Sequence, residues 1–246
     1  MSFLVITLIY LKEMSETKNL LRENLAEVHE KIEKAAQRCG RNADEIKLIA
    51  VSKTHSTRVL QDAMTAGATV FGENKVQEAE EKIEELGKEN LEWHLLGHLQ
   101  SNKARRAVKL FDVIHTLDSV ELAERLERIC IEENRANLSV LAQVDLAGEQ
   151  AKNGIAEKEL PKLIEHLKNY EHLKLNGLMI IPPFFEDTEK ARPFFRRLRE
   201  IRDELLPNGE LSMGMSHDFE IATEEGATLV RVGTAIFGQR NGTPSS

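Results

Sequence analysis

The sequence predicts an α/β protein of a single domain, in which eight parallel strands close into a (β/α)8 barrel. Eight short apolar runs alternate with segments of helical periodicity, polar residues follow most of these runs directly, and no stretch rich in Pro, Gly or Ser divides the chain. A length of 246 residues is also typical of such a barrel. Closure is the expected arrangement of eight strand-helix units because it leaves no strand edge exposed.

The first helix is predicted over residues 15–39, where apolar side chains recur every three or four positions, and Gly40 ends it. The apolar stripe consists of Leu21, Leu25, Val28, Ile32, Ala35 and Cys39. Residues 1–14 contain an apolar run that lacks the basic start and cleavage site of a signal peptide and is too short to span a bilayer. We therefore expect an N-terminal extension at 1–14, with Met14 as the natural start, rather than a targeting segment.

The strands are bounded by turns and separated by helices of ordinary length. An open dinucleotide-binding sheet would carry G-x-G-x-x-G after its first strand, but here residues 52–55 read Ser-Lys-Thr-His. The barrel is therefore favoured over an open doubly wound sheet, and we expect it to span 15–240, followed by a flexible tail at 241–246. The predicted strands are 47–51, 69–71, 91–96, 113–116, 138–144, 175–180, 211–215 and 228–232.

Composition narrows the classes of partner. A formal net charge of -8 argues against nucleic acid or an anionic membrane, which are bound through basic surfaces. The two cysteines, Cys39 and Cys130, form no C-x-x-C pair, which predicts neither a disulfide scaffold nor a zinc site and fits a reducing cytoplasm. His94 and His98 straddle a strand end rather than share a helical face, so we expect no metal site.

Functional side chains of such a barrel lie where the strands end, at their carboxyl-terminal side. The charge run at 78–85 lies on a predicted helix instead and is expected to be a solvated face. The candidates at these strand ends are Lys53, Asn74, His98, Asp118, Asp145, Met179, Ser216 and the turn after Arg231.

Lys53 is the first informative candidate. It follows an apolar strand, where poor hydration disfavours the ammonium form and makes the amine a nucleophile able to form an imine with an aldehyde. The alternative is a lysine that reaches solvent or pairs with a carboxylate, as most lysines at strand ends do.

The segment 230–238 is the second informative candidate. Here an apolar strand runs directly into Gly233-Thr234 and a short apolar helical turn, a layout in which backbone N–H groups point at a phosphate. Ser216 ends the preceding strand and can add a hydroxyl to the same anion. Alone the turn fits a plain helix cap equally well, but its occurrence together with Lys53 favours a phosphate site.

Six separated segments resemble the YggS-type family of pyridoxal phosphate homeostasis proteins, in order from about residue 20 to residue 240. They are 50–54, 71–78, 93–103, 177–179, 212–218 and 230–238. The resemblance implies a barrel of the alanine racemase type (fold type III of the pyridoxal 5′-phosphate proteins) without the β domain of the racemase.

For the site, the resemblance implies pyridoxal 5′-phosphate (PLP) held as a Schiff base on Lys53. It implies that Ser216, Gly233 and Thr234 hold the phosphate, that Arg231 faces the pyridine nitrogen, and that Asn74 lines the pocket. Lys75 stands where the family has a tyrosine, which puts a role of that side chain in doubt.

For function, the resemblance implies a carrier or buffer in PLP homeostasis that affects amino-acid metabolism, with no catalytic residue and no established turnover. PLP is the expected cofactor, PLP-dependent apo-enzymes are candidate recipients, and a monomer is expected.

Two enzymatic alternatives stay open, a PLP-dependent enzyme of the amino-acid racemase type and a Schiff-base aldolase. An arginine at the pyridine nitrogen disfavours its protonation and makes the ring a weak electron sink. A racemase compensates with two acid/base groups, whereas the two tyrosines here, Tyr10 and Tyr170, are expected in the extension and in a helix. A carrier is therefore favoured.

Overall fold

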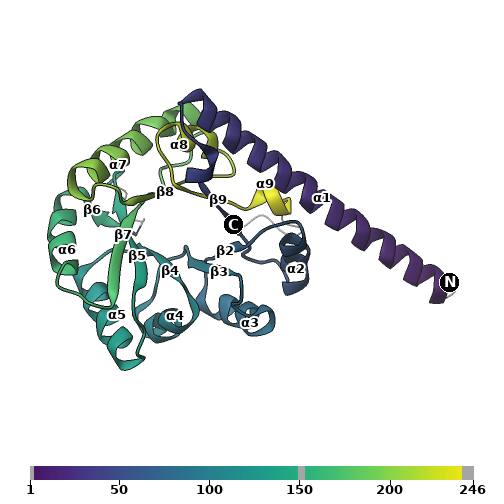
Figure 1. The fold of residues 1–246 in the computed structure, drawn as a ribbon, viewed down its shortest axis with the longest axis horizontal. Coiled ribbons are helices and arrows are strands. Elements are labelled where there is room, and N and C mark those ends of the chain that lie inside the picture. The colour runs from purple at the N-terminus through teal and green to yellow at the C-terminus, as the bar shows by residue number, and fades with distance from the viewer. Residues whose placement is uncertain (1–2, 149–152, 240–246) are drawn as a thin grey trace.

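Eight parallel strands close into a barrel in the computed structural model, which describes residues 3–148 and 153–239 (Figure 1). The sheet order is β4-β3-β2-β1-β9-β8-β7-β5, and β4 pairs with β5 to close it. The predicted (β/α)8 barrel is confirmed. The strands are β1 (Lys47–Val51), β2 (Val70–Glu73), β3 (Glu92–Leu95), β4 (Val113–Leu117), β5 (Leu138–Asp145), β7 (Leu173–Met179), β8 (Glu210–Met215) and β9 (Leu229–Val232).

The helices form a ring outside the strands (Figure 1). They are α1 (Phe3–Arg38), α2 (Thr57–Thr65), α3 (Val76–Leu86), α4 (Ala104–Leu110), α5 (Val120–Glu132), α6 (Leu160–Leu167), α7 (Arg192–Leu205), α8 (Phe219–Glu224) and α9 (Thr234–Phe237). Short 3-10 turns precede or join several of them: η1 (Ala43–Glu45), η2 (Ser101–Lys103), η3 (Glu157–Glu159) and η4 (Thr188–Ala191). Among the described residues, none of these helices has the length and apolar character needed to cross a bilayer.

The sequence located every barrel strand, but it missed β6 (Ile155–Ala156), which adds two residues parallel to the end of β5. A two-residue strand has too few positions to display an alternating pattern. Tyr170 was also misplaced, because α6 ends at Leu167 and Tyr170 follows it. The tail at 241–246 lies outside the described residues.

Helix α1 runs without interruption from Phe3 to Arg38 and begins well before the predicted start at residue 15. Its backbone projects beyond the barrel at the N-terminal side (Figure 1), and the division at residue 14 stays a prediction. The predicted stripe is buried at Leu21, Leu25 and Val28, and α1 contacts α2, α8 and α9. Asn24 donates a hydrogen bond from Nδ2 to the carbonyl of Ile236 at 2.8 Å, so α1 anchors α9.

The barrel interior is only partly apolar. One cluster fills part of it with Ile49, Leu96, Val113, Leu141, Met179 and Leu229. Charged and polar groups occupy the rest, among them His94, His115, Ser212 and Arg231, all buried. Burying such groups costs free energy unless each finds a partner, so their contacts constrain the interior more strongly than apolar packing does.

The carboxylate of Glu127 on α5 fixes the start of β7. It accepts hydrogen bonds from the backbone N–H groups of Glu171, His172 and Leu173, the last at 2.8 Å, and it lies 3.0 Å from Nδ1 of His172. Burial raises the pKa of this carboxyl, but the hydrogen bonds from His172 and the backbone outweigh burial and hold the pKa below its ordinary value.

Glu127→Ala is expected to lower the free energy of unfolding by about 1–3 kcal/mol at pH 7, because three backbone N–H groups, of which that of Leu173 is buried, lose their acceptor. The folded pKa lies below the unfolded one, so this stabilisation is complete above roughly pH 5 and is lost as the pH falls through the folded pKa. Urea unfolding from pH 7 to pH 3 measures both effects. Glu124→Ala, an exposed change on the same helix, is the control, and an equal loss in both variants would contradict the assignment.

Candidate functional site

Four neighbouring strands bring most of the predicted site residues to one side of the barrel mouth. β1 pairs with β2 on one side and with β9 on the other, and β9 pairs with β8. Because the strands are parallel, the residues that follow them share one edge of the sheet. Asn74, Lys53, Gly233 and Ser216 therefore follow four adjacent strands.

The turn after β9 presents backbone N–H groups to the hydroxyl of Ser216. Oγ of Ser216 accepts hydrogen bonds from the N–H of Gly233 at 3.0 Å and from that of Ala235 at 3.4 Å. Gly233 caps α9, and Thr234 is the exposed first residue of that helix. Convergent N–H groups at a Gly-Thr turn are suited to an anionic oxygen, so Ser216, Gly233 and Thr234 are brought together as predicted.

Close backbone approaches hold this corner in place. Gly233 lies against the end of β1, where a Cβ would be 3.3 Å from the carbonyl oxygen of Val51. Gly214 has a φ of 89° and lies against α8, where a Cβ would be 2.6 Å from that of Ala222. The ring of His55, from the turn after β1, stacks on Phe237 of α9 at 4.7 Å. The lysine turn and α9 are thus in direct contact.

Arg231 is buried, with 4% of its surface exposed, and its guanidinium is held from two sides. Nη1 donates to Oγ of Ser212 at 2.6 Å, and Nη2 donates to the carbonyl of Ile180 at 2.8 Å. Burial lowers the pKa of Arg231 to about 10, against the opposing charge of Asp218. The group therefore stays a cation at neutral pH inside the barrel.

Lys53 lies half-buried in the turn after β1, and a buried ion network fixes the backbone before it. Nζ of Lys82 donates to the carbonyl of Ser52 at 2.8 Å and contacts Oε1 of Glu73 and Oε1 of Glu78, each at 2.7 Å. Oγ of Ser52 donates to the same oxygen of Glu73 at 2.6 Å. Burial raises the pKa of Glu73, against the hydrogen bonds from Lys82 and Ser52.

The same network fixes the backbone after Lys53. The N–H of Thr54 donates to Oε1 of Glu78, and Thr54 has a φ of 68°, a left-handed conformation that is uncommon outside glycine. The interpretation of 78–85 as a solvated face was therefore wrong at Glu78 and Lys82, which turn towards the barrel. The sequence feature that could have indicated this contact is the i,i+4 spacing of Glu78 and Lys82, which allows an ion pair on one helix face.

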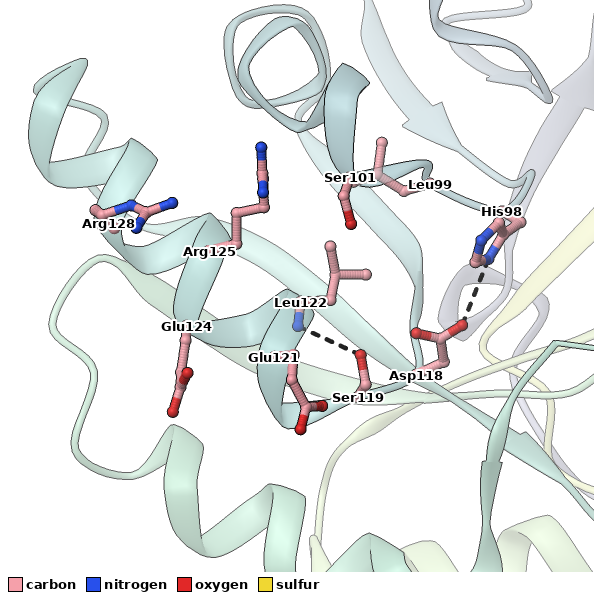
Figure 2. A pocket seen from close by; sticks show the side chains of 10 residues that line it. All are labelled: His98, Leu99, Ser101, Asp118, Ser119, Glu121, Leu122, Glu124, Arg125 and Arg128. Atoms are coloured by element: carbon pink, nitrogen blue, oxygen red, sulfur yellow. Dashed lines mark hydrogen bonds and ion pairs between the residues drawn. The ribbon is translucent and has the colours of Figure 1, made fainter.

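The remaining predicted site residues, apart from Asn74, lie away from the corner formed by the turns after β1, β9 and β8. His98 and Asp118 form an ion pair at 3.4 Å beside a cavity of about 370 Å³ along α5, and Figure 2 shows Arg125 and Arg128 on the same helix. Asp145 accepts N–H bonds from its own turn, at Ala147 and Gly148. Met179 is buried in the interior cluster. Asn74 does follow β2, and its carbonyl oxygen packs on Gly97, where a Cβ would lie 2.1 Å away.

The fold and the site together define a (β/α)8 barrel whose mouth carries a lysine turn beside a turn that presents backbone N–H groups. A family model for the alanine racemase N-terminal domain matches residues 24–241. The chain belongs to this family and, within it, to the pyridoxal phosphate homeostasis proteins. It is 44% identical to the protein of that name from Aquifex aeolicus, over 89% of this chain and 97% of the relative, and 41% identical to that from Escherichia coli K12, over 91% and 98%.

Solved structures agree with this placement. PipY of Synechococcus elongatus, determined with PLP bound, is 39% identical and superposes with a TM-score of 0.77 over 89% of this chain and all of that one. Alanine racemase from Corynebacterium glutamicum superposes with a TM-score of 0.65 at 17% identity, over 93% of this chain and 63% of the racemase. The second similarity supports the barrel fold alone.

Lys82→Met is expected to destabilise the folded protein by about 3–5 kcal/mol, because it leaves Glu73 as an uncompensated buried charge and the carbonyl of Ser52 without its donor. Urea unfolding measures this loss. Adding Glu73→Gln to Lys82→Met should restore part of it, since the buried charge is then removed. Lys75→Met, at the exposed cap of α3, is the control. A loss no larger than that of the control would mean that the network does not support the lysine turn.

Proposed function

We propose that this chain binds PLP at the mouth formed by β2, β1, β9 and β8, linked to Lys53, and that it serves PLP homeostasis as a carrier rather than as an enzyme. The observation that carries the proposal is the convergence of the Gly233 and Ala235 N–H groups on Ser216, on strands adjacent to that of Lys53. The name of the relatives and the PLP bound in PipY support the same ligand.

The donor set fits the phosphate of PLP. An anionic oxygen that replaces or joins the hydroxyl of Ser216 would accept from the backbone N–H groups of Gly233 and Ala235, and the exposed Thr234 adds a hydroxyl at the start of α9. Asn74, after β2, would line the opposite side of the pocket. These groups would bind and orient PLP, and none of them would transfer a proton.

Lys53 supplies the amine. When bound, PLP offers an aldehyde that a lysine can capture as an imine. Lys53 is half-buried, and the contacts of Ser52 and Glu78 hold its turn in one conformation.

Arg231 favours the carrier over the racemase. Facing the ring nitrogen of PLP, a protonated guanidinium disfavours protonation of that nitrogen, so little carbanion charge can be absorbed by the ring. A racemase also needs a second acid/base group across the substrate. Tyr170 follows α6 and lines a surface cavity with Ile131 of α5, in the helical layer rather than at the mouth.

The finer features of the proposal rest on the sequence and on the family resemblance. We place the carrier in the cytoplasm as a monomer, with PLP-dependent apo-enzymes as recipients, and with a barrel domain of residues 15–240 after an extension at 1–14. The net charge of -8 supports the absence of nucleic acid and anionic membrane among its partners.

Lys53→Ala is expected to abolish covalent capture of PLP while leaving weaker, reversible binding, because the phosphate contacts are separate from the imine. Borohydride reduction followed by peptide mass spectrometry should label Lys53 in the natural chain and no lysine in the variant. Lys75→Ala, at the exposed cap of α3, should be labelled as the natural chain is. Labelling of another lysine, or of none, would exclude the proposal, and a colourless protein that captures other aldehydes at Lys53 would favour the aldolase.

The PLP-loaded protein is expected not to exchange the Cα hydrogen of common amino acids at enzymatic rates of roughly 1–1000 per second, because Arg231 keeps the ring a weak electron sink. Each L- and D-amino acid is incubated with the loaded protein in deuterated water and followed by NMR. Rapid exchange that scrambles the stereocentre, and that is lost in Lys53→Ala, would reassign the protein as a racemase-type enzyme.

A further inference from the structure

A continuous row of polar side chains crosses the barrel interior beneath Arg231. Oγ of Ser212 (β8) lies 2.6 Å from Nη1 of Arg231 (β9) and 2.9 Å from Nδ1 of His115 (β4). Nε2 of His115 lies 2.7 Å from Nδ1 of His94 (β3), whose Nε2 lies 2.9 Å from Oε1 of Glu92. We call these five residues the interior chain.

The carboxylate end fixes the direction of the hydrogen bonds when both imidazoles are neutral. A guanidinium only donates, so Oγ of Ser212 accepts from Arg231. A carboxylate only accepts, so Nε2 of His94 carries the proton donated to Glu92. When both imidazoles are neutral, Nδ1 of His94 accepts from Nε2–H of His115, and Nδ1 of His115 accepts the proton of Ser212. Both rings are then Nε2–H tautomers, and each of their nitrogens has a partner.

An extra proton breaks this order. An imidazolium has two N–H donors and no acceptor. Protonating either histidine would therefore make Nδ1–H of His115 donate to Oγ of Ser212, which can also accept from Arg231, and the proton of Ser212 would lose its acceptor. Burial lowers the pKa of His115 well below its ordinary value, and the positive charges near it act in the same direction. The charged and titratable groups that face the pair are Lys47 of β1, Glu92 of β3 and Arg231 of β9.

The far end of the interior chain is open. Glu92 and His94 line a cavity of about 260 Å³ at the amino-terminal ends of the strands, together with Lys47, Ser139, Asn176 and Glu210. Nζ of Lys47 contacts both oxygens of Glu92, at 3.0 and 2.8 Å. The hydrogen bond from His94 and, against burial, that from Lys47 hold the pKa of Glu92 at about 2. Glu92 is therefore a permanent acceptor.

We propose that His94 and His115 are positioning residues, which hold Ser212 as an acceptor and thereby fix the Arg231 guanidinium in one orientation at the cofactor ring. This inference rests on the proposed function only for the ligand that Arg231 faces. The orientation of the Arg231 guanidinium is thereby linked to Glu92, at the opposite end of the barrel, through a continuous series of hydrogen bonds.

The tautomers are tested first, in the cofactor-free protein. Nitrogen-15 NMR of labelled histidines should report a neutral Nε2–H form for His115 from pH 8 down to pH 6, and Ser212→Ala should change the Nδ1 resonance of His115. A protonated or Nδ1–H form of His115 in this range would overturn the inference. Neither reading depends on PLP, so failure here is distinct from failure of the proposed function.

Binding is tested second. His115→Phe keeps an aromatic ring but removes the acceptor for Ser212, and it should weaken PLP binding about tenfold, as expected for loss of one hydrogen-bonded orientation of a charged group, with Lys53 still labelled by borohydride. The ring nitrogen of labelled PLP should also shift. Thr116→Val is the matched control, because Thr116 is buried on the same strand but donates to the carbonyl of Gly97 instead.

Equal PLP affinity and equal ring-nitrogen shifts in His115→Phe and Thr116→Val would reduce the histidines to packing residues and overturn the inference. If His115→Phe does not fold, the same comparison is made with Ser212→Ala, which removes only a hydroxyl. If the natural chain fails to capture PLP at Lys53, the proposed function fails, while the tautomers of the interior chain still decide whether Ser212 and Arg231 are held as described.

Discussion

The pairing of β4 with β5 closes the sheet, and the rest of the architecture depends on that closure. In a closed parallel sheet all carboxyl-terminal strand ends meet at one mouth. Lys53 and Ser216 are distant in sequence, yet they follow strands that both neighbour β9. The close packing of Gly233 on Val51 and the hydrogen bond from Gly233 to Ser216 both require this register.

The barrel buries polar groups on both sides of its sheet, where charge is costly, and two polar networks compensate that cost. One joins Glu73 and Lys82 between the sheet and α3, beneath the lysine turn, and the other is the interior chain beneath Arg231. Neither Lys82 nor His115 belongs to the turns assigned to the ligand. The backbone of the Lys53 turn and the guanidinium of Arg231 are nevertheless held by these buried partners, because a buried donor or acceptor without one is strongly disfavoured.

The outer layer contributes to the site as well. Helix α1 lies outside the barrel, and through Asn24 it bonds the backbone of α9, the short helix whose start faces Ser216. This hydrogen bond suits a site that binds and releases a phosphate ligand, because it would hold the N–H groups at the start of α9 in the same direction with and without the ligand. The arginine that we propose to face the ring fits retention of a cofactor better than catalysis with it.

The sequence by itself determined the fold class, every barrel strand, and the turns that carry Lys53, Ser216 and Gly233, because strand periodicity and turn chemistry are local properties. Only the tertiary structure decided which polar residues turn inward. Lys82 stands in a charge run that reads as a solvated helix face, and it is buried because Glu73, on the adjacent strand, needs a cation. His115 and Ser212 are 97 residues apart and meet only because the barrel closes. Such pairings depend on burial and register, which no local pattern encodes.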